Sequence, residues 1–191
     1  NDTFSNATIY QVNVYKFVAA LLTREKLINV LDIGCGFGVK LSTYIYPMCC
    51  DIVGVDSQHS IDFCRKNYEF GKWLLDDIEN PNFGFDRKFD CIISSDVIEH
   101  LIDPDRLFEY IKRHSNKNTH IIISTPNRDK FRGVESFGPS PNTAHVREWN
   151  QAELICYIQS QGFNIVEHFE TEDFIGSPVR GCMVFHICLK E

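Results

Sequence analysis

The stretch NVLDIGCGFGVK, residues 29–40, places three glycines at alternate positions directly behind a short apolar run. The apolar run has the length of a buried strand, and the residues after the glycines have the pattern of a helix. Gly34, Gly36 and Gly38 therefore lie in the turn that joins a strand to a helix. Residues without Cβ atoms let such a turn bend sharply and approach a ligand closely, with backbone amides as donors.

Strands and helices alternate along the rest of the chain, and most of the strands are apolar on both faces. Such alternation indicates a parallel sheet that is covered by helices, in a doubly wound α/β arrangement. We expect strands at residues 29–34, 51–57, 72–78, 89–96, 119–126, 164–171 and 181–190, and helices at residues 8–24, 39–47, 57–68, 104–114 and 150–162.

The composition suits one domain, residues 1–191, because 43% hydrophobic and 13% aromatic residues can build a sizeable core. No repeat, low-complexity tract or linker divides the chain. Its expected parts are an N-terminal helix (about 8–24), a core (about 28–128), a substrate-side loop (about 128–149), and a C-terminal helix with two strands (about 150–190).

The charge and the cysteines restrict the partners and the location of the protein. Its net charge of -7 argues against a long nucleic-acid footprint. No apolar run reaches the length of about 18 residues that membrane insertion requires. The eight cysteines form no CxxC pair, so we expect them to be reduced and the protein to be cytoplasmic.

The second strand ends in Asp56, which is expected to face the glycine turn. In doubly wound sheets the ligand lies at the carboxyl ends of the strands, where an Asp at this position can accept hydrogen bonds from ribose hydroxyls. A dinucleotide fingerprint, GxGxxG, would need a glycine in place of Val39. The spacing GxGxG alone leaves a pyridine nucleotide and other nucleoside cofactors open.

The motifs VLDIGCGFG, VGVD, LDDI, FDCIISSDVIEHL and IIISTPN occur in this order within residues 28–128. Together they resemble class I S-adenosylmethionine-dependent methyltransferases. The resemblance implies a Rossmann-like fold with a seven-stranded, mostly parallel sheet, an antiparallel last strand and helices on both faces. Among such enzymes, the motifs are most similar to those of the ubiquinone-biosynthesis-type O-methyltransferases.

The resemblance also implies which residues bind S-adenosylmethionine. The glycine backbone would face the methionine part, Asp32 its amino group and Asp56 the ribose. Asp77, or its neighbour Asp76, would accept a hydrogen bond from the adenine amino group. The implied cofactor-binding set is Asp32, Gly34, Cys35, Gly36, Gly38, Asp56, Ser57, Asp77, Ile78, Ser94 and Ser95.

Two histidines are candidates for the chemistry. His100 belongs to DVIEHL after the fourth strand, and His145 lies in the loop that is expected to cover the cofactor. Since imidazole titrates near neutral pH, either could take a proton from an acceptor hydroxyl. We therefore expect O-methylation of a small molecule or sugar. The alternatives are N-methylation, a metal-dependent RNA 2'-O-methyltransferase and a non-catalytic cofactor-binding scaffold.

A metal site is a further alternative. Ubiquinone-type O-methyltransferases and small-RNA 2'-O-methyltransferases carry Glu-x-x-Glu-His and a later histidine, and this chain has Asp96 in place of the first Glu. Asp96, Glu99, His100 and His145 would suit Mg²⁺, Mn²⁺ or Zn²⁺. The same residues also occur as helix caps and loop anchors in methyltransferases that need no metal, and this reading is favoured.

Overall fold

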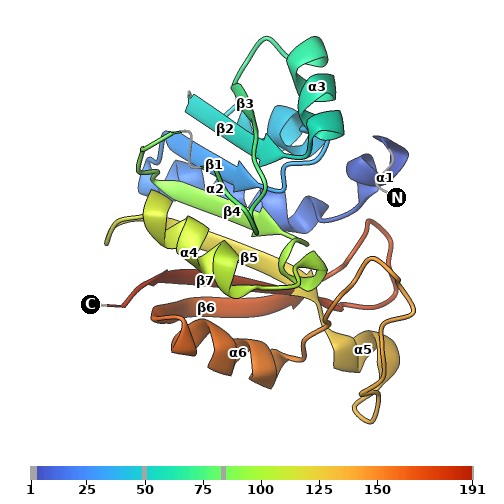
Figure 1. The fold of residues 1–191 in the computed structure, drawn as a ribbon. Coiled ribbons are helices and arrows are strands. Elements are labelled where there is room, and N and C mark those ends of the chain that lie inside the picture. Colours follow the sequence, from blue (N-terminus) through green and yellow to red (C-terminus); the bar gives the residue numbers. More distant parts are fainter. Residues whose placement is uncertain (1–3, 49–50, 83–84, 191) are drawn as a thin grey trace.

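The computed structural model describes residues 4–48, 51–82 and 85–190, which form one sheet flanked by helices (Figure 1). The strand order is β3-β2-β1-β4-β5-β7-β6; β1 to β5 are parallel, and β7 runs antiparallel to both β5 and β6. The strands are β1 (Asn29–Ile33), β2 (Asp51–Asp56), β3 (Lys72–Leu75), β4 (Cys91–Ser95), β5 (His120–Pro126), β6 (Phe163–Thr171) and β7 (Cys182–Leu189). The seven-stranded, mostly parallel sheet is confirmed.

Helices cover both faces of the sheet, with α4 and α6 in front of it and α2 behind it in Figure 1. Alternate strand residues face the two layers: Ile92 packs with the α4 and α6 side chains, whereas Ile93 packs with those of α2, η1 and α3. The helices are α1 (Phe4–Ile9), α2 (Val12–Glu25), η1 (Leu41–Ile45), α3 (Gln58–Asn67), η2 (Ile98–His100), α4 (Asp105–His114), α5 (Arg128–Arg132) and α6 (Gln151–Ser160).

The prediction of one continuous N-terminal helix is wrong, because the helix is broken at Gln11. This residue adopts a left-handed conformation (φ 58°), and its backbone amide donates to the carbonyl of Asp173 (2.9 Å). Tyr10 and Phe174 form a β-bridge, and the amide of Ile175 donates to Ile9 (3.1 Å). The segment between α1 and α2 is thus paired with the loop between β6 and β7, which rises beside α1 in Figure 1.

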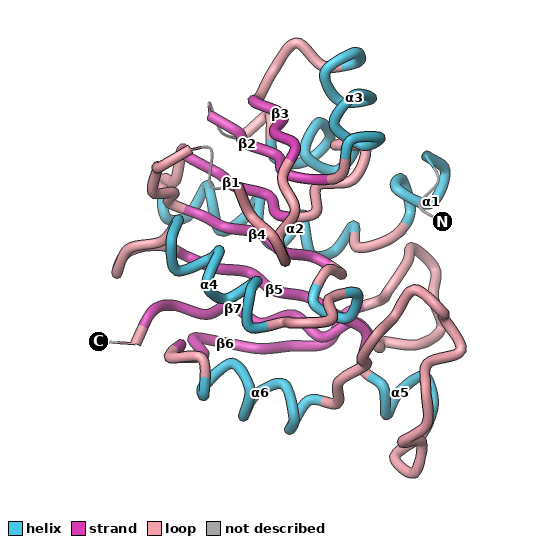
Figure 2. Tube along the Cα trace, viewed as in Figure 1, coloured by secondary structure: helices cyan, strands magenta, loops and turns pink. Residues whose placement is uncertain are grey.

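Other boundaries differ from the expectations by a few residues. The expected helix 39–47 consists mostly of the π-turn η1. Ser57 precedes α3 but makes no side-chain capping bond, and its hydroxyl donates to Asp56 (3.0 Å). The loop after β5 contains the short helix α5, which the sequence did not predict. Figure 2 shows the long loop that continues from α5 to α6.

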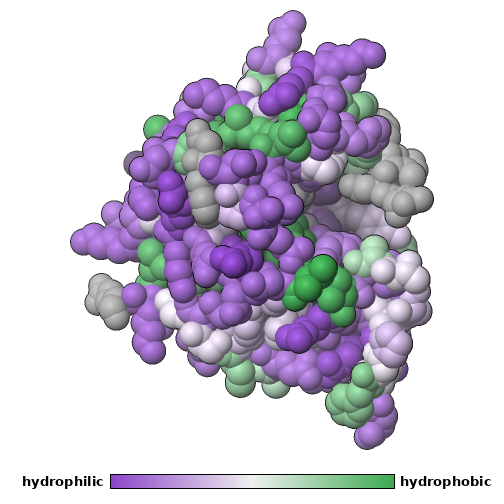
Figure 3. Space-filling view, viewed as in Figure 1, coloured by the Kyte–Doolittle hydropathy of each residue, from purple (hydrophilic) through white to green (hydrophobic). Residues whose placement is uncertain are grey.

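The face shown in Figure 3 is mostly hydrophilic and is hollowed on the side where the parallel strands end. Within residues 4–48, 51–82 and 85–190, no helix has both the length and the hydrophobicity to cross a bilayer. Six cysteines in these ranges are free thiols. Four of them are buried, whereas Cys188 is half-buried and Cys156 is exposed.

Candidate cofactor and active site

A cavity of about 1130 Å³ opens at the carboxyl ends of the parallel strands. It lies where β1 has β2 on one side and β4 on the other, which is the point at which the strand order reverses. Its lining includes the glycine turn, the residues after β2, β3 and β4, and part of the long loop. The predicted residues that line it are Gly34, Cys35, Gly36, Asp56, Ser57, Asp77, Ile78, Ser95, Asp96, Glu99, His100 and His145.

The glycine turn is held in a conformation that side chains rarely adopt. Gly34 has φ 78°, and a Cβ atom there would lie 2.3 Å from Cγ2 of Val97. Gly38 has φ 66°, but its missing Cβ faces Trp73 rather than the cavity, at 2.9 Å from Cη2. The amides of Gly34 and Cys35 donate to the carbonyl of Val55 (2.8 and 3.2 Å), so the turn is tied to β2.

Asp56 connects the glycine turn to the start of α3. Its Oδ2 accepts the amide of Gly36 (2.8 Å), and its Oδ1 accepts the amide and hydroxyl of Ser57 (2.7 and 3.0 Å). A carboxylate has about four lone-pair sites, so these three bonds leave roughly one, on Oδ2, for a further donor. Asp56 is half-buried and lines the cavity.

Asp32 lies beneath the glycine turn and does not line the cavity. Its Oδ2 accepts a hydrogen bond from Tyr15 (2.8 Å), and its buried Oδ1 has no hydrogen-bond partner among the described residues. Burial raises the pKa of Asp32 to about 7, although the bond from Tyr15 and the charge of Lys40 oppose this. Tyr15, which binds Asp32, and Lys40 do line the cavity.

The two acidic residues after β3 have different surroundings. Asp76 is buried, and its carboxylate accepts the amides of Asp77 and Asn82 (3.1 and 2.8 Å) and the hydroxyl of Tyr110 (3.1 Å). Asp77 is exposed, and its carboxylate accepts the amide of Glu79 (3.0 Å). Asp77 is therefore better placed than Asp76 to accept from a ligand.

Ser94 and Ser95 also differ. The hydroxyl of Ser94 is buried, lacks a hydrogen-bond partner in the described ranges and is not part of the cavity wall. Ser95 lines the cavity, and its hydroxyl shares a 2.7 Å hydrogen bond with Ser124.

Asp96 and Asp173 form an acidic wall of the cavity beside Ser95, and only Asp96 of the two was singled out from the sequence. Gln11 donates from Nε2 to both Asp96 and Asp173, the latter at 3.0 Å. Burial, followed by repulsion from Asp173, raises the pKa of Asp96 to about 7. Asp96 also adopts a left-handed backbone conformation, with φ 54°. Burial, and then the charge of Asp96, raises the pKa of Glu99 as well.

The two predicted histidines meet at the mouth of the cavity. Their ring centroids are 4.9 Å apart, and Nδ1 of His100 lies 2.9 Å from the carbonyl of Ala144. Possible ligand atoms of Glu99, His100 and His145 all lie within 4.8 Å of one another. Asp96 does not belong to this group in the described structure, so only three of the four residues of the metal alternative come together.

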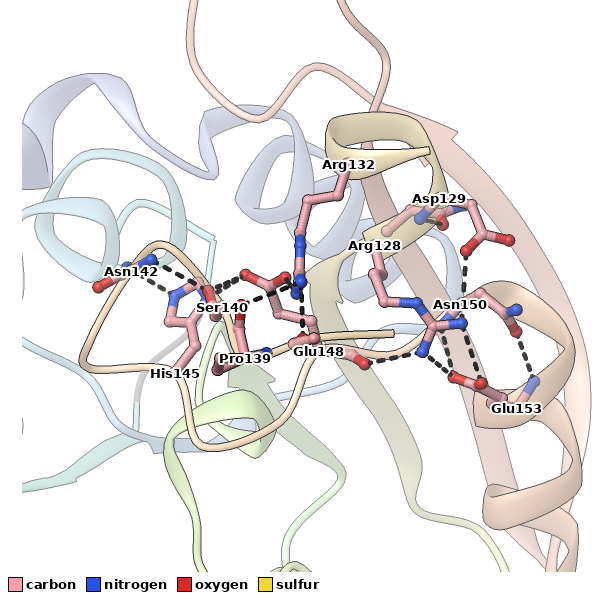
Figure 4. Close-up of polar contacts among 12 residues, drawn as sticks. Arg128, Asp129, Arg132, Pro139, Ser140, Asn142, His145, Glu148, Asn150 and Glu153 are labelled. Atoms are coloured by element: carbon pink, nitrogen blue, oxygen red, sulfur yellow. Dashed lines mark hydrogen bonds and ion pairs between the residues drawn. The ribbon is translucent and has the colours of Figure 1, made fainter. Parts of the chain in front are cut away.

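The loop that contains His145 is tied to its surroundings at several points. The amides of Val146 and Arg147 donate to the carbonyl of Glu99 (2.8 and 3.2 Å), which joins the loop to η2. Glu148 contacts both His145 and Arg132 (Figure 4). Burial opposes ionisation of Glu148, but hydrogen bonds from Ser140, Arg132 and His145 lower its pKa.

Residues 9–168 match the family of methyltransferase domains. The chain belongs to this family. An S-adenosylmethionine-dependent methyltransferase from Clostridium acetobutylicum has the same fold, with a TM-score of 0.73 at 15% identity, and the match covers 93% of this chain and 91% of that one. The expected class I methyltransferase fold is confirmed, and the cofactor of this methyltransferase domain is S-adenosylmethionine.

Two curated relatives are named ubiquinone biosynthesis O-methyltransferase. The protein of Pelagibacter ubique is 33% identical over 109 residues, which cover 54% of this chain and 44% of the relative. The protein of Azorhizobium caulinodans is 28% identical over 177 residues, which cover 82% of this chain and 65% of the relative. The match thus spans between 44% and 65% of the length of these two relatives.

The cavity fits the cofactor of the methyltransferase family. Asp56 retains acceptor capacity, Asp77 is exposed, and the Gly34 turn brings backbone close to the cavity. Wall residues that the sequence did not predict include several from the N-terminal segment, the segment after the glycine turn and two loops: Tyr10, Gln11, Tyr15, Lys40, Asn142 and Asp173. Lys40 is the last residue of the stretch quoted above, so position alone could have indicated it; the others carry no local signal.

Proposed function

We propose that this methyltransferase domain transfers a methyl group to a hydroxyl oxygen of a small molecule or sugar. The observation that carries the proposal is the pair of imidazole rings of His100 and His145 at the mouth of the cofactor cavity. A carbonyl oxygen can only accept, so His100 donates from Nδ1 to Ala144, and its Nε2 is the basic nitrogen. A base of this kind is useful when the acceptor must lose a hydroxyl proton.

The proposed cofactor contacts follow from the walls of the cavity. Asp56 would accept from the ribose through Oδ2, and Asp77 from the adenine amino group, with the Ile78 amide as a donor to the ring. The backbone of Gly34, Cys35 and Gly36 would face the methionine part. Gly38, Asp32 and Ser94 would support this site from behind, with Tyr15 between Asp32 and the cofactor.

When bound, S-adenosylmethionine supplies an electrophilic methyl group on its sulfonium. The protein then has to hold an acceptor hydroxyl in line with the methyl and exclude water. His145 or His100 would take the hydroxyl proton at Nε2 while the acceptor oxygen receives the methyl group that the cofactor would supply. The names of the two curated relatives support oxygen as the acceptor atom.

A metal-assisted form of the same transfer is the second candidate. It is favoured by the cluster of Glu99, His100 and His145 and by the buried Oε1 of Glu99, which has no hydrogen-bond partner in the described part of the chain. One carboxylate and two imidazoles suit Zn²⁺ or Mn²⁺, and Mg²⁺ less well. The cation would polarise the acceptor oxygen and lower the pKa of its hydroxyl.

The test is a screen of hydroxylated metabolites, sugars and nucleotide sugars for transfer of a labelled methyl group, followed by His145→Ala on the best acceptor. General-base catalysis predicts a loss of turnover of about 10² to 10⁴ fold, with almost unchanged cofactor affinity. Loss of activity in EDTA that Mn²⁺ or Zn²⁺ restores would select the metal-assisted form. Methylation of amines only would select N-transfer, whereas binding of the cofactor without any turnover would select a scaffold.

The acceptor and the location are part of the proposal. The net charge of -7 and the acidic wall of Asp96 and Asp173 disfavour an RNA acceptor. The free thiols of the described cysteines support a cytoplasmic location, which fractionation of cells that produce the protein would test.

A further inference from the structure

Glu148 is a nearly buried carboxylate that contacts His145 directly. Its side chain is 9% exposed, and its Oε1 lies 2.8 Å from Nδ1 of His145. The same oxygen accepts from the hydroxyl of Ser140 (2.6 Å), and Oε2 accepts from Nη1 of Arg132 (2.7 Å). Figure 4 shows Glu148 between Arg132 and His145, with Ser140 directed at the same carboxylate.

These contacts determine which nitrogen of His145 carries the proton. A carboxylate paired with a guanidinium is ionised and can only accept, so Nδ1 of His145 must donate to Glu148. The other ring nitrogen, Nε2, then carries the lone pair. The side-chain amide of Asn142 lies 2.9 Å from Nε2, and its Nδ2 donates there because its Oδ1 accepts the amide of Ala144 (3.1 Å).

We propose that Glu148 is a positioning residue for methyl transfer: it holds His145 as the Nδ1–H tautomer, with the basic Nε2 directed at the acceptor. This inference rests on the proposed function, in which His145 receives the acceptor proton or binds a cation. Both roles need an unprotonated Nε2, and a carboxylate behind the ring is a common way to secure it. The acceptor hydroxyl takes the place that the amide of Asn142 occupies at Nε2.

Arg132 holds the carboxylate in the required orientation. Its Nη1 pairs with Oε2 of Glu148, while its Nη2 donates to the carbonyls of Gly138 and Pro139 (2.7 and 3.0 Å). The guanidinium therefore occupies Oε2 and leaves Oε1 for His145. If anchoring the loop were the whole role of this cluster, Arg132 could do so through the two carbonyls, without a carboxylate against the imidazole.

Glu148→Gln tests the role because it changes the hydrogen-bonding pattern and not the shape. The charged Arg132 keeps the single remaining oxygen of Gln, so the new amide group faces Nδ1 of His145. Since that amide donates, Nδ1 must accept, and the proton moves to Nε2. The matched control is Glu153→Gln, which alters the neighbouring pair of Arg128 and Glu153 (2.8 Å), joining α5 to α6 without contact to His145.

The direct readout is the tautomer of His145, measured by long-range ¹⁵N–¹H NMR at pH 8 on protein labelled with ¹⁵N-histidine. His145→Ala identifies its signals among those of the seven histidines. We expect Nδ1–H in the unaltered protein and in Glu153→Gln, and Nε2–H in Glu148→Gln. An Nε2–H tautomer in the unaltered protein overturns the proposal, even if Glu148→Gln does not fold, and so does an unchanged tautomer in a folded Glu148→Gln.

Turnover on the acceptor found by the screen gives the second readout. Glu148→Gln should lower kcat by about 10² to 10⁴ fold, as loss of the base does, while KM for S-adenosylmethionine and the activity of Glu153→Gln stay near their original values. The NMR result needs neither acceptor nor cofactor, so a negative result there removes the role of Glu148 alone. Full turnover of His145→Ala would instead remove the proposed function of His145.

Discussion

The hydroxyl of Tyr15 in α2 donates a 2.8 Å hydrogen bond to Oδ2 of Asp32, the penultimate residue of β1. Both side chains are buried, and the charge of Asp32 raises the pKa of Tyr15, in addition to the larger effect of burial. A buried carboxylate directly below the glycine turn therefore makes the stability of the cofactor-free domain depend on pH.

We expect Asp32 to destabilise the cofactor-free domain as the pH rises from about 4 to above 7. Its pKa is raised from 3.8 to about 7, so the folded state binds the proton more tightly than the unfolded state. Protonated Asp32 therefore favours the folded state at low pH, and this stabilisation is lost as the pH rises through the folded-state pKa. Asp32→Asn, which keeps an acceptor for Tyr15, should remove this part of the slope. Urea unfolding of both proteins between pH 4.5 and 8 measures it, and parallel curves would contradict the expectation.

Gly34→Ala should destabilise the domain by about 1–3 kcal/mol, and by more if the side chain of Val97 does not move away from the new methyl group. The new methyl group meets Cγ2 of Val97 at 2.3 Å, in addition to the strain of φ 78°. Gly162→Ala is the matched control, because Gly162 has φ 83° and nothing within 4 Å of its missing Cβ. Equal urea midpoints for the two variants would show that the contact with Val97 has no cost.

Asp56→Ala should weaken the binding of S-adenosylmethionine by about 1.5–3 kcal/mol, the usual range for hydrogen bonds to a charged group. The variant loses the proposed acceptor for the ribose and also the bond that holds the amide of Gly36. Calorimetry with S-adenosylmethionine, S-adenosylhomocysteine and NAD measures the change. Asp62→Ala, on the exposed side of α3, serves as the control, and equal affinities would place the ribose elsewhere.

The loop of residues 133–148 should exchange its amide hydrogens more slowly when cofactor and acceptor are bound. It lines the cavity through Asn142, Ala144 and His145, and its amides at Val146 and Arg147 are bonded to η2. Hydrogen exchange followed by mass spectrometry should therefore show protection of this loop that exceeds that of α6. Equal protection with and without ligands would exclude a role as a cover.

The parts of the fold that follow from local sequence were predictable. Buried strands such as Cys91–Ser95 are apolar on both faces, and the glycine turn follows one of them. Helix α5 was missed because its five residues have no apolar period; Asn127 caps it, and Arg128 joins it to Glu153, 25 residues away. The break at Gln11 likewise depends on Asp173, a partner 162 residues distant.

The candidate site was predictable to the same extent. The strand ends and most of the glycine turn line one cavity, since parallel strands bring their carboxyl ends together, whereas Asp32, Gly38 and Ser94 do not line it. The different burial of Asp76 and Asp77 involves Tyr110, which lies 34 residues away and binds Asp76 in the interior. No periodicity of either segment contains that information.

The bridge between residues 9–11 and residues 173–175 also has a consequence for the order of folding. Contacts between segments so distant in sequence need the largest loop closure, so they form after the strands between them have paired. The acidic wall beside the proposed methyl-transfer position is therefore among the last parts of the domain to assemble, and a refolding chain should acquire its sheet before it can bind its cofactor.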